Sequence, residues 1–101
     1  MIETATQNAD KIQFVAEVLK TIGHPIRLQI IELLDETESM SVAELQDALQ
    51  IEQSLLSHHL TKMKSTGVLS SSRNGRNIYY QLKLNEVSKI LDCMKNCELK
   101  P

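Results

Sequence analysis

Aromatic residues are scarce in this sequence and make up 3% of its 101 residues. Hydrophobic residues of all kinds amount to 42%, an ordinary share for a folded domain. The core is therefore expected to consist mainly of leucine, isoleucine and valine. A chain of this length is large enough for a single modest core. We expect one domain over residues 10–98, preceded by a flexible N-terminus over residues 1–9.

Long apolar runs and a secretion signal are also missing. No run approaches the roughly 20 apolar residues that span a bilayer, and Met1-Ile2-Glu3-Thr4 lacks the basic-then-apolar pattern of a signal peptide. These absences predict a cytoplasmic protein with no membrane partner. The two cysteines, Cys93 and Cys97, lie four residues apart in a predicted helix and do not form the framework of a disulfide-rich secreted domain.

Acidic residues are absent from one long window of the chain. Between Gln53 and Asn85 there is no Asp or Glu, whereas five basic residues occur there: Lys62, Lys64, Arg73, Arg76 and Lys83. The rest of the chain carries 6 basic and 13 acidic residues, so its net charge is −7. Such asymmetry within one small domain predicts a surface for phosphate groups, and chance clustering is the alternative explanation.

Apolar residues in the first third of the chain recur at helical spacing. They predict a helix from Asp10 that ends at Gly23 and carries a single apolar stripe. The stripe consists of Ile12, Val15, Val18, Leu19 and Ile22. Pro25 suits the first turn of a second helix, which is apolar over most of its circumference. This second helix is expected to be the central core element.

The next two predicted helices form a helix-turn-helix. After an acidic connector over residues 35–39, Ser41-Val42-Ala43-Glu44 matches a capping box and predicts a short helix to about Leu49. A turn over residues 50–52 leads to a helix over residues 53–65, whose apolar side consists of Leu56, Leu60 and Met63. Two short helices joined this tightly are typical of DNA-binding proteins, in which the second helix enters the major groove.

Two β-like runs follow, over residues 68–73 and 76–82. Asn74-Gly75 between them predicts a hairpin with a type I′ turn, which places Arg73 and Arg76 opposite each other at the tip. A last helix is predicted from Asn85 to about Cys97. The predicted fold class is mainly α (α+β), a winged helix-turn-helix with about five helices and a two-stranded β-hairpin as the wing.

Three separated blocks resemble the ArsR/SmtB family of repressors. Residues 19–31, which read LKTIGHPIRLQII, look like the opening signature of that family. Ser57-His58-His59-Leu60 is similar to the signature of its reading helix, and Gly75-Arg76 with Tyr79-Tyr80 matches its wing. The resemblance covers roughly residues 12–83. It implies a homodimeric bacterial repressor that binds double-stranded operator DNA, dimerises through its first and last helices, and is often released by a metal or metalloid.

The sequence departs from the family at its inducer sites. The family's thiolate motif on the third helix is absent, because residues 41–49 contain no cysteine. The family's alternative site on the last helix uses carboxylate and histidine ligands, and its positions hold Leu84, Glu86, Cys97 and Lys100. Glu52 also stands where the family usually has a capping serine at the start of the reading helix. These departures leave the inducer undefined.

The face of the 53–65 helix opposite its apolar side carries hydrogen-bonding and basic side chains and no acid. We predict that this face and the hairpin tip contact DNA, against the alternative of a plain solvated face. The predicted DNA-binding residues are Gln53, Ser54, Ser57, His58, Thr61, Lys62, Lys64, Arg73 and Arg76. His59 and Leu55 lie at the edge of the face, so His59 is expected to support the helix rather than read bases. His24, before a proline, is expected to be structural.

Three interpretations of Cys93 and Cys97 stay open. At i and i+4 in a helix they would point to the same side, where they could bind a soft metal or metalloid, with a third ligand from the partner subunit, or react with oxidants or persulfides. They could instead act as small hydrophobic residues at a dimer interface, or be an incidental exposed pair. No cofactor is required by the sequence.

Other function classes fit the sequence less well. Ser54 and His58 have the spacing of a nucleophile and a base, but no acidic residue within 53–85 can orient the imidazole. A Gly-rich turn for an oxyanion or a nucleotide is also missing, so the chain is not expected to be an enzyme. The alternatives to an inducer-released repressor are a winged helix that binds only proteins and an ArsR-like regulator without metal sensing.

Overall fold

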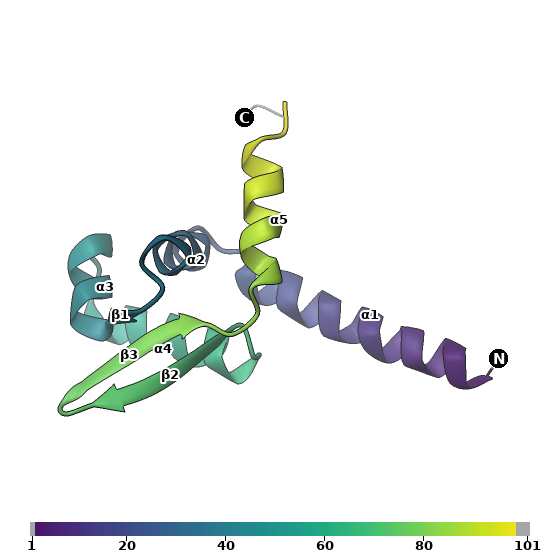
Figure 1. Ribbon diagram of the computed structural model, residues 1–101, viewed down its shortest axis with the longest axis horizontal. Coiled ribbons are helices and arrows are strands. Elements are labelled where there is room, and N and C mark those ends of the chain that lie inside the picture. The colour runs from purple at the N-terminus through teal and green to yellow at the C-terminus, as the bar shows by residue number, and fades with distance from the viewer. Residues whose placement is uncertain (1, 99–101) are drawn as a thin grey trace.

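The computed structural model describes residues 2–98, with side chains from residue 8 onward. A compact body holds the middle of the chain, and two helices extend from it in different directions (Figure 1). These are α1 (Ile2–Ile22) and α5 (Glu86–Lys95). The body consists of α2 (Pro25–Thr37), β1 (Met40–Ser41), α3 (Val42–Leu49), α4 (Gln53–Ser65), β2 (Leu69–Asn74) and β3 (Asn77–Leu82).

The core forms around α2, as its nearly continuous apolar surface predicts. Ile30, Ile31 and Leu34 are buried, and α2 packs against α1, α3, α4, α5 and β3. The apolar side of α4 meets it with Leu56, Leu60 and Met63. Burying each of these side chains stabilises the fold by about 1.5–3 kcal/mol, so the core fixes the position of α4.

The ends of two helices differ from the prediction. The backbone of α1 is helical from Ile2, not from Asp10, because residues 2–9 contain no glycine or proline to stop it. The flexibility of residues 1–9 stays a prediction, and Met1 lies outside the described residues. Helix α2 continues into the acidic connector and ends at Thr37, and its C-cap residue is Glu38, whose φ is 71°.

The capping box at the start of α3 is confirmed. The backbone N–H of Glu44 donates to Ser41 Oγ at 3.1 Å, and that of Ser41 donates to Glu44 Oε1 at 2.9 Å. The same Ser41 N–H bond is the main reason why the pKa of Glu44 lies below its ordinary value. Both orphan donors are thus satisfied where α3 begins, which sets the start of the helix-turn-helix.

The sheet has three antiparallel strands in the order β1-β3-β2, not the two of the predicted hairpin. The added strand, β1, pairs Met40 with Tyr80 and Ser41 with Tyr79. It is only two residues long, too short to show a strand pattern of its own. Its pairing attaches the start of α3 to the wing.

The hairpin turn lies one residue later than predicted. Asn74 pairs with Asn77, so the two turn residues are Gly75 and Arg76, and the predicted type I′ turn at Asn74-Gly75 is wrong. Gly75 has a φ of 65°, whereas Arg76 has no positive φ, a pattern typical of a type II′ turn with glycine first. Arg73 therefore lies opposite Ile78, and the predicted facing of Arg73 and Arg76 is wrong too.

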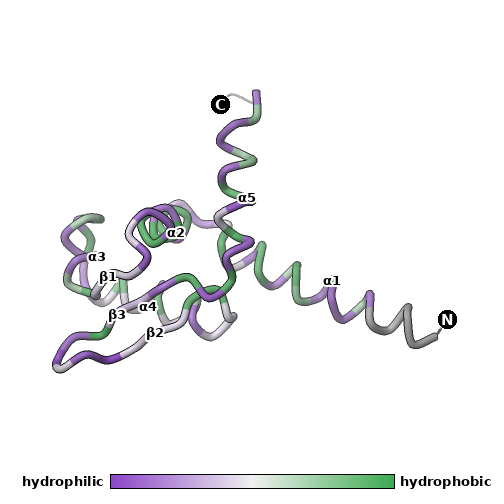
Figure 2. The backbone as a smooth tube through the Cα atoms, viewed as in Figure 1, coloured by the Kyte–Doolittle hydropathy of each residue, from purple (hydrophilic) through white to green (hydrophobic). Residues whose placement is uncertain are grey.

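Helices α1 and α5 leave apolar side chains in solvent. Hydrophobic residues recur along both helices outside the body (Figure 2). Phe14, Val15 and Leu19 are 50%, 51% and 47% exposed, and Ile90 is 39% exposed. An apolar groove of about 510 Å³ runs between the two helices; it is lined by Lys11, Phe14, Val15, Val18, Leu19, Leu84, Glu86, Val87 and Ile90. Only Val18 and Val87 of this set belong to the core.

Candidate nucleic-acid interface

The two faces of α4 separate as the sequence predicts. Leu56, Leu60 and Met63 are buried against the body. Every predicted DNA-binding side chain on α4 is exposed: Gln53, Ser54, Ser57, His58, Thr61, Lys62 and Lys64. The polar face is therefore free to meet a partner, with donors and cations and no acid along its length. Lys62 and Lys64 lie in the last turn, where they also complement the helix dipole.

The start of α4 lacks a side-chain cap. Glu52 occupies the N-cap position, but its carboxylate makes no capping hydrogen bond. Its negative charge suits the positive end of the helix dipole. The same charge would repel a phosphate that approached the first turn, so phosphate contacts are expected farther along α4 and on the wing.

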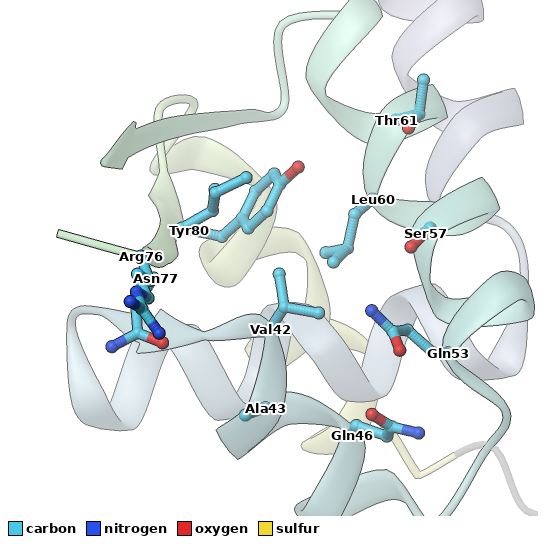
Figure 3. A pocket seen from close by; sticks show the side chains of 11 residues that line it. Val42, Ala43, Gln46, Gln53, Ser57, Leu60, Thr61, Arg76, Asn77 and Tyr80 are labelled. Carbon is cyan, nitrogen blue, oxygen red and sulfur yellow. The ribbon is translucent and has the colours of Figure 1, made fainter. Parts of the chain in front are cut away.

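A hollow of about 410 Å³ lies between α3, the exposed side of α4 and the wing. Figure 3 shows Gln53, Ser57 and Thr61 along one wall and Arg76 and Asn77 on the opposite side. Its apolar floor consists of Val42, Leu60, Ile78 and Tyr80, and Gln46 of α3 completes the polar rim. The amides, hydroxyls and guanidinium around this hollow can donate hydrogen bonds to phosphate oxygens.

The two wing arginines have different surroundings. Arg76, in the turn, lines the hollow, whereas Arg73 on β2 does not. Both are exposed. The structure thus brings Arg76 together with Gln53, Ser57 and Thr61, and it leaves Arg73 on the outer part of the wing.

Gln46 and Asn77 line the hollow but were not among the predicted DNA-binding residues. Gln46 belongs to α3, which the sequence presents as a support for α4 rather than as a reader. Asn77 enters the hollow because the turn lies at Gly75-Arg76, one residue later than the Asn-Gly signal indicates. The correct position of the turn would have identified Asn77, whereas the turn has no bearing on Gln46 of α3.

His58 and His59 separate as predicted. His58 is exposed on the polar face, whereas His59 is 3% exposed and its Nδ1 accepts a hydrogen bond of 2.9 Å from Arg27 Nε. Burial lowers the pKa of His59, and His24, Arg27 and His58 lower it further. His24 is structural, as expected, because its Nδ1 accepts from the backbone N–H of Ile26 and caps α2. Sequence reasoning missed the partnership with Arg27, 32 residues away.

The cysteines do not share a helix. Helix α5 ends at Lys95, so Cys97 lies beyond the C-cap Asn96, and the predicted i, i+4 arrangement with Cys93 is wrong. Both thiols are free and exposed. Among the side chains that the structure describes, no group of three or more His, Cys, Asp or Glu is placed to hold a metal ion. Lys100, one of the four positions of the family's alternative site, lies outside the described residues.

Known proteins are similar to this chain in sequence and in architecture. Residues 24–71 match the family described as bacterial regulatory protein, arsR family. An uncharacterized HTH-type transcriptional regulator from Methanocaldococcus jannaschii is 36% identical over 86 residues, which cover 82% of this chain and 97% of the relative. The chain belongs to the ArsR family. It is a DNA-binding transcriptional regulator with a winged helix-turn-helix.

Two similar proteins have solved structures like this one. The transcriptional repressor PagR of Bacillus anthracis is 38% identical over 76 residues, or 75% of this chain and 76% of PagR. Its crystal structure gives a TM-score of 0.78 and covers 85% of this chain and 98% of that chain. A homodimeric winged helix-turn-helix domain from Mycobacterium bovis, described as a possible ArsR-family regulator, gives 0.75 at 26% identity, covering 86% of this chain and 80% of that chain.

Among the described residues, no helix of this ArsR-family chain is both long and apolar enough to cross a bilayer. Charged residues such as Lys11, Glu17 and Lys89 also occur along α1 and α5.

Proposed function

We propose that this chain is a transcriptional repressor that binds operator DNA as a homodimer. The observation that carries the proposal is the hollow flanked by the acid-free face of α4 and by Arg76 of the wing. The exposed face of α4 would enter the major groove, with Ser57, His58 and Thr61 facing base edges. One strand of the DNA backbone would pass through the hollow, against Arg76 and the amides of Gln46 and Asn77.

The homodimer would form through α1 and α5. The groove between these helices is lined almost wholly by apolar side chains, and contiguous apolar surface of this kind marks an interface. The homodimeric relative from Mycobacterium bovis supports this assembly. A two-fold dimer would place two copies of α4 in successive major grooves, about 34–36 Å apart.

The proposal is tested by selecting a duplex from a random double-stranded DNA library with the purified protein. A repressor dimer is expected to select a sequence with two inverted half-sites, centred about 10 base pairs apart. Fluorescence anisotropy with the selected duplex should then give two protomers per duplex. Selection of no duplex, or binding that does not distinguish the selected duplex from a scrambled one, would contradict the proposal and favour a winged helix that binds proteins.

Thiol-based release from the operator is a second candidate, and the exposure of Cys93 and Cys97 favours it. Exposed thiols can react with oxidants or persulfides, or bind a soft metal together with ligands from the partner subunit. The test is to titrate the DNA complex with Zn(II), As(III), persulfide and peroxide, using wild type and the Cys93→Ser/Cys97→Ser double variant. Equal responses of the two proteins would eliminate thiol sensing and leave a regulator whose cysteines only pack.

A further inference from the structure

A polar network joins three helices behind the DNA-facing surface. Arg27 of α2 donates from Nε to His59 Nδ1 of α4 and from Nη1 to the carbonyl oxygen of Thr21, both at 2.9 Å. Thr21 lies one residue before the end of α1. The planar guanidinium therefore connects α1, which lines the apolar groove, to α4, which faces DNA. A lysine ammonium could not reproduce these two directed bonds.

A second contact between α1 and α4 is weaker. Thr21 Oγ1 lies 3.1 Å from Thr66 Oγ1, just after α4. Each hydroxyl has one proton, and each lies within donating distance of a carbonyl one turn back, those of Glu17 and Lys62. A bond between the two hydroxyls would cost one of those backbone bonds. The connection therefore depends mainly on Arg27.

The bond between Arg27 and His59 exists only while His59 is neutral. Since the guanidinium always donates, Nδ1 must accept, and the ring proton must lie on Nε2. Within the described residues, Nε2 is buried without a hydrogen-bond partner. A protonated His59 would turn an N–H toward Arg27 and place two cations in contact.

Among the described groups that influence His59, no acid would offset the positive charge of a protonated ring. The described groups that influence the ionisation of His59 are His24, Arg27 and His58, none of them a carboxylate. The ring of His24 lies 4.5 Å from that of His59, centroid to centroid, and the ring of His58 lies 5.8 Å away. Lower pH should therefore break the connection rather than strengthen it.

We propose that Arg27 is a positioning residue for operator binding, which holds α4 in place relative to α1 through neutral His59. This inference rests on the proposed function, because α4 must be the helix that meets DNA. Arg27 should therefore affect DNA affinity although it does not contact DNA. Affinity should also fall as the pH is lowered through the titration of His59, because the DNA-bound arrangement requires the neutral ring.

The first test compares Arg27→Lys with wild type in anisotropy titrations of the selected duplex at about pH 7.5. The loss of two directed bonds to the guanidinium should weaken binding about tenfold. Lys20→Arg, which also exchanges one basic residue for another next to Thr21, should bind like wild type. If Arg27 instead contacted a phosphate, lysine would serve nearly as well. Wild-type affinity in Arg27→Lys would therefore overturn the inference.

The second test is the pH profile of binding from about pH 7.5 to about pH 5.5, across the ordinary histidine pKa of about 6.5. Wild-type affinity should fall with decreasing pH, and His59→Asn should remove the fall, because the Asn carbonyl accepts from Arg27 but does not titrate. His58→Asn should leave the fall in place, whatever its effect on affinity at about pH 7.5, because the bond from Arg27 goes to His59 and not to His58. A profile unchanged by His59→Asn would overturn the inference.

The substitutions Arg27→Lys and His59→Ala, each of which removes the bond between the two side chains, must also act as a unit. The Arg27→Lys/His59→Ala double variant should bind no more weakly than the weaker single variant, because both remove the same connection. Independent, additive losses would overturn the inference, and thermal unfolding verifies that each variant is folded at the temperature of the titration. A wild-type protein that selects no duplex would overturn the proposed function itself, which is a separate result from a failure of Arg27 alone.

Discussion

The two halves of this molecule use their apolar residues in opposite ways. In the half formed by α3, α4 and the sheet, Leu45, Leu56 and Leu60 are buried and the outer face is polar. In the half formed by α1 and α5, Phe14, Leu19 and Met94 remain 50%, 47% and 56% exposed. The first half buries its apolar side chains within one chain, whereas the second half leaves them exposed at the proposed dimer interface. The same helical periodicity therefore forms a core in one place and a proposed interface in the other.

The largest expected effect is on the core of the DNA-facing half. Leu60 is 1% exposed and packs inward from the floor of the hollow, so Leu60→Ala should lower the free energy of unfolding by about 3 kcal/mol. Leu19→Ala is the matched control, since it removes the same atoms from a side chain that is 47% exposed. Chemical denaturation checks both. If both variants lost the same free energy of unfolding, and the loss did not depend on protein concentration, the contrast between core and interface would be contradicted.

The next effect concerns the groove between α1 and α5. Leu19→Glu places a charge in the predicted dimer interface and should raise the dimer dissociation constant about a hundredfold, because an unpaired charge is costly to bury. Sedimentation equilibrium measures this change. Ser54→Glu, an exposed position on α4, should leave the dimer intact while it weakens DNA binding. Unchanged association of Leu19→Glu would mean that α1 does not form the interface.

A smaller effect is expected at the capping box. Ser41→Ala removes the hydroxyl that accepts from Glu44 N–H, and should lower the free energy of unfolding by about 1 kcal/mol. Thermal or chemical denaturation measures the loss. Ser54→Ala, on the polar face of α4, should change stability little because its side chain is exposed. An equal loss in both variants would show that the serine hydroxyl of the cap has no special role.

The smallest effect is on the pH dependence of stability. Because the folded pKa of His59 is lowered, the unfolded chain binds more protons between that pKa and the ordinary value of about 6.5. The contribution of neutral His59 to the free energy of unfolding is full above about pH 6.5, and it is lost as the pH falls toward and through the folded pKa. Denaturation at several pH values should show this decrease in wild type and in His58→Asn but not in His59→Asn. A decrease that persists in His59→Asn would assign it to another group.

Local signals in the sequence were sufficient for the helices of the DNA-facing half. The Ser41–Glu44 cap fixes the start of α3, and the spacing of Leu56, Leu60 and Met63 fixes the inner face of α4. These elements depend on residues within a few positions of each other. The same spacing also places His58 on the exposed face and His59 on the buried side of α4.

Features that depend on distant partners could not be predicted. Strand β1 exists because Met40 and Ser41 pair with Tyr80 and Tyr79, some forty residues later. The hairpin turn differs by one residue because Asn-Gly and Gly-Arg each provide a glycine that allows a tight turn, and strand pairing chooses between them. The bond between Arg27 and His59 likewise exists only in three dimensions.

The central claim, that α4 and the wing form a surface for operator DNA, is tested most directly by the salt dependence of binding. The logarithm of the association constant for the selected duplex is measured against the logarithm of salt concentration, for wild type and for Arg73→Ala/Arg76→Ala. Each lost phosphate contact should reduce the slope by about one unit, so the double variant should lose about two. Lys20→Ala/Lys89→Ala, with the same change in net charge outside the acid-free window, should keep the wild-type slope. An unchanged slope in the arginine variant would contradict the claim.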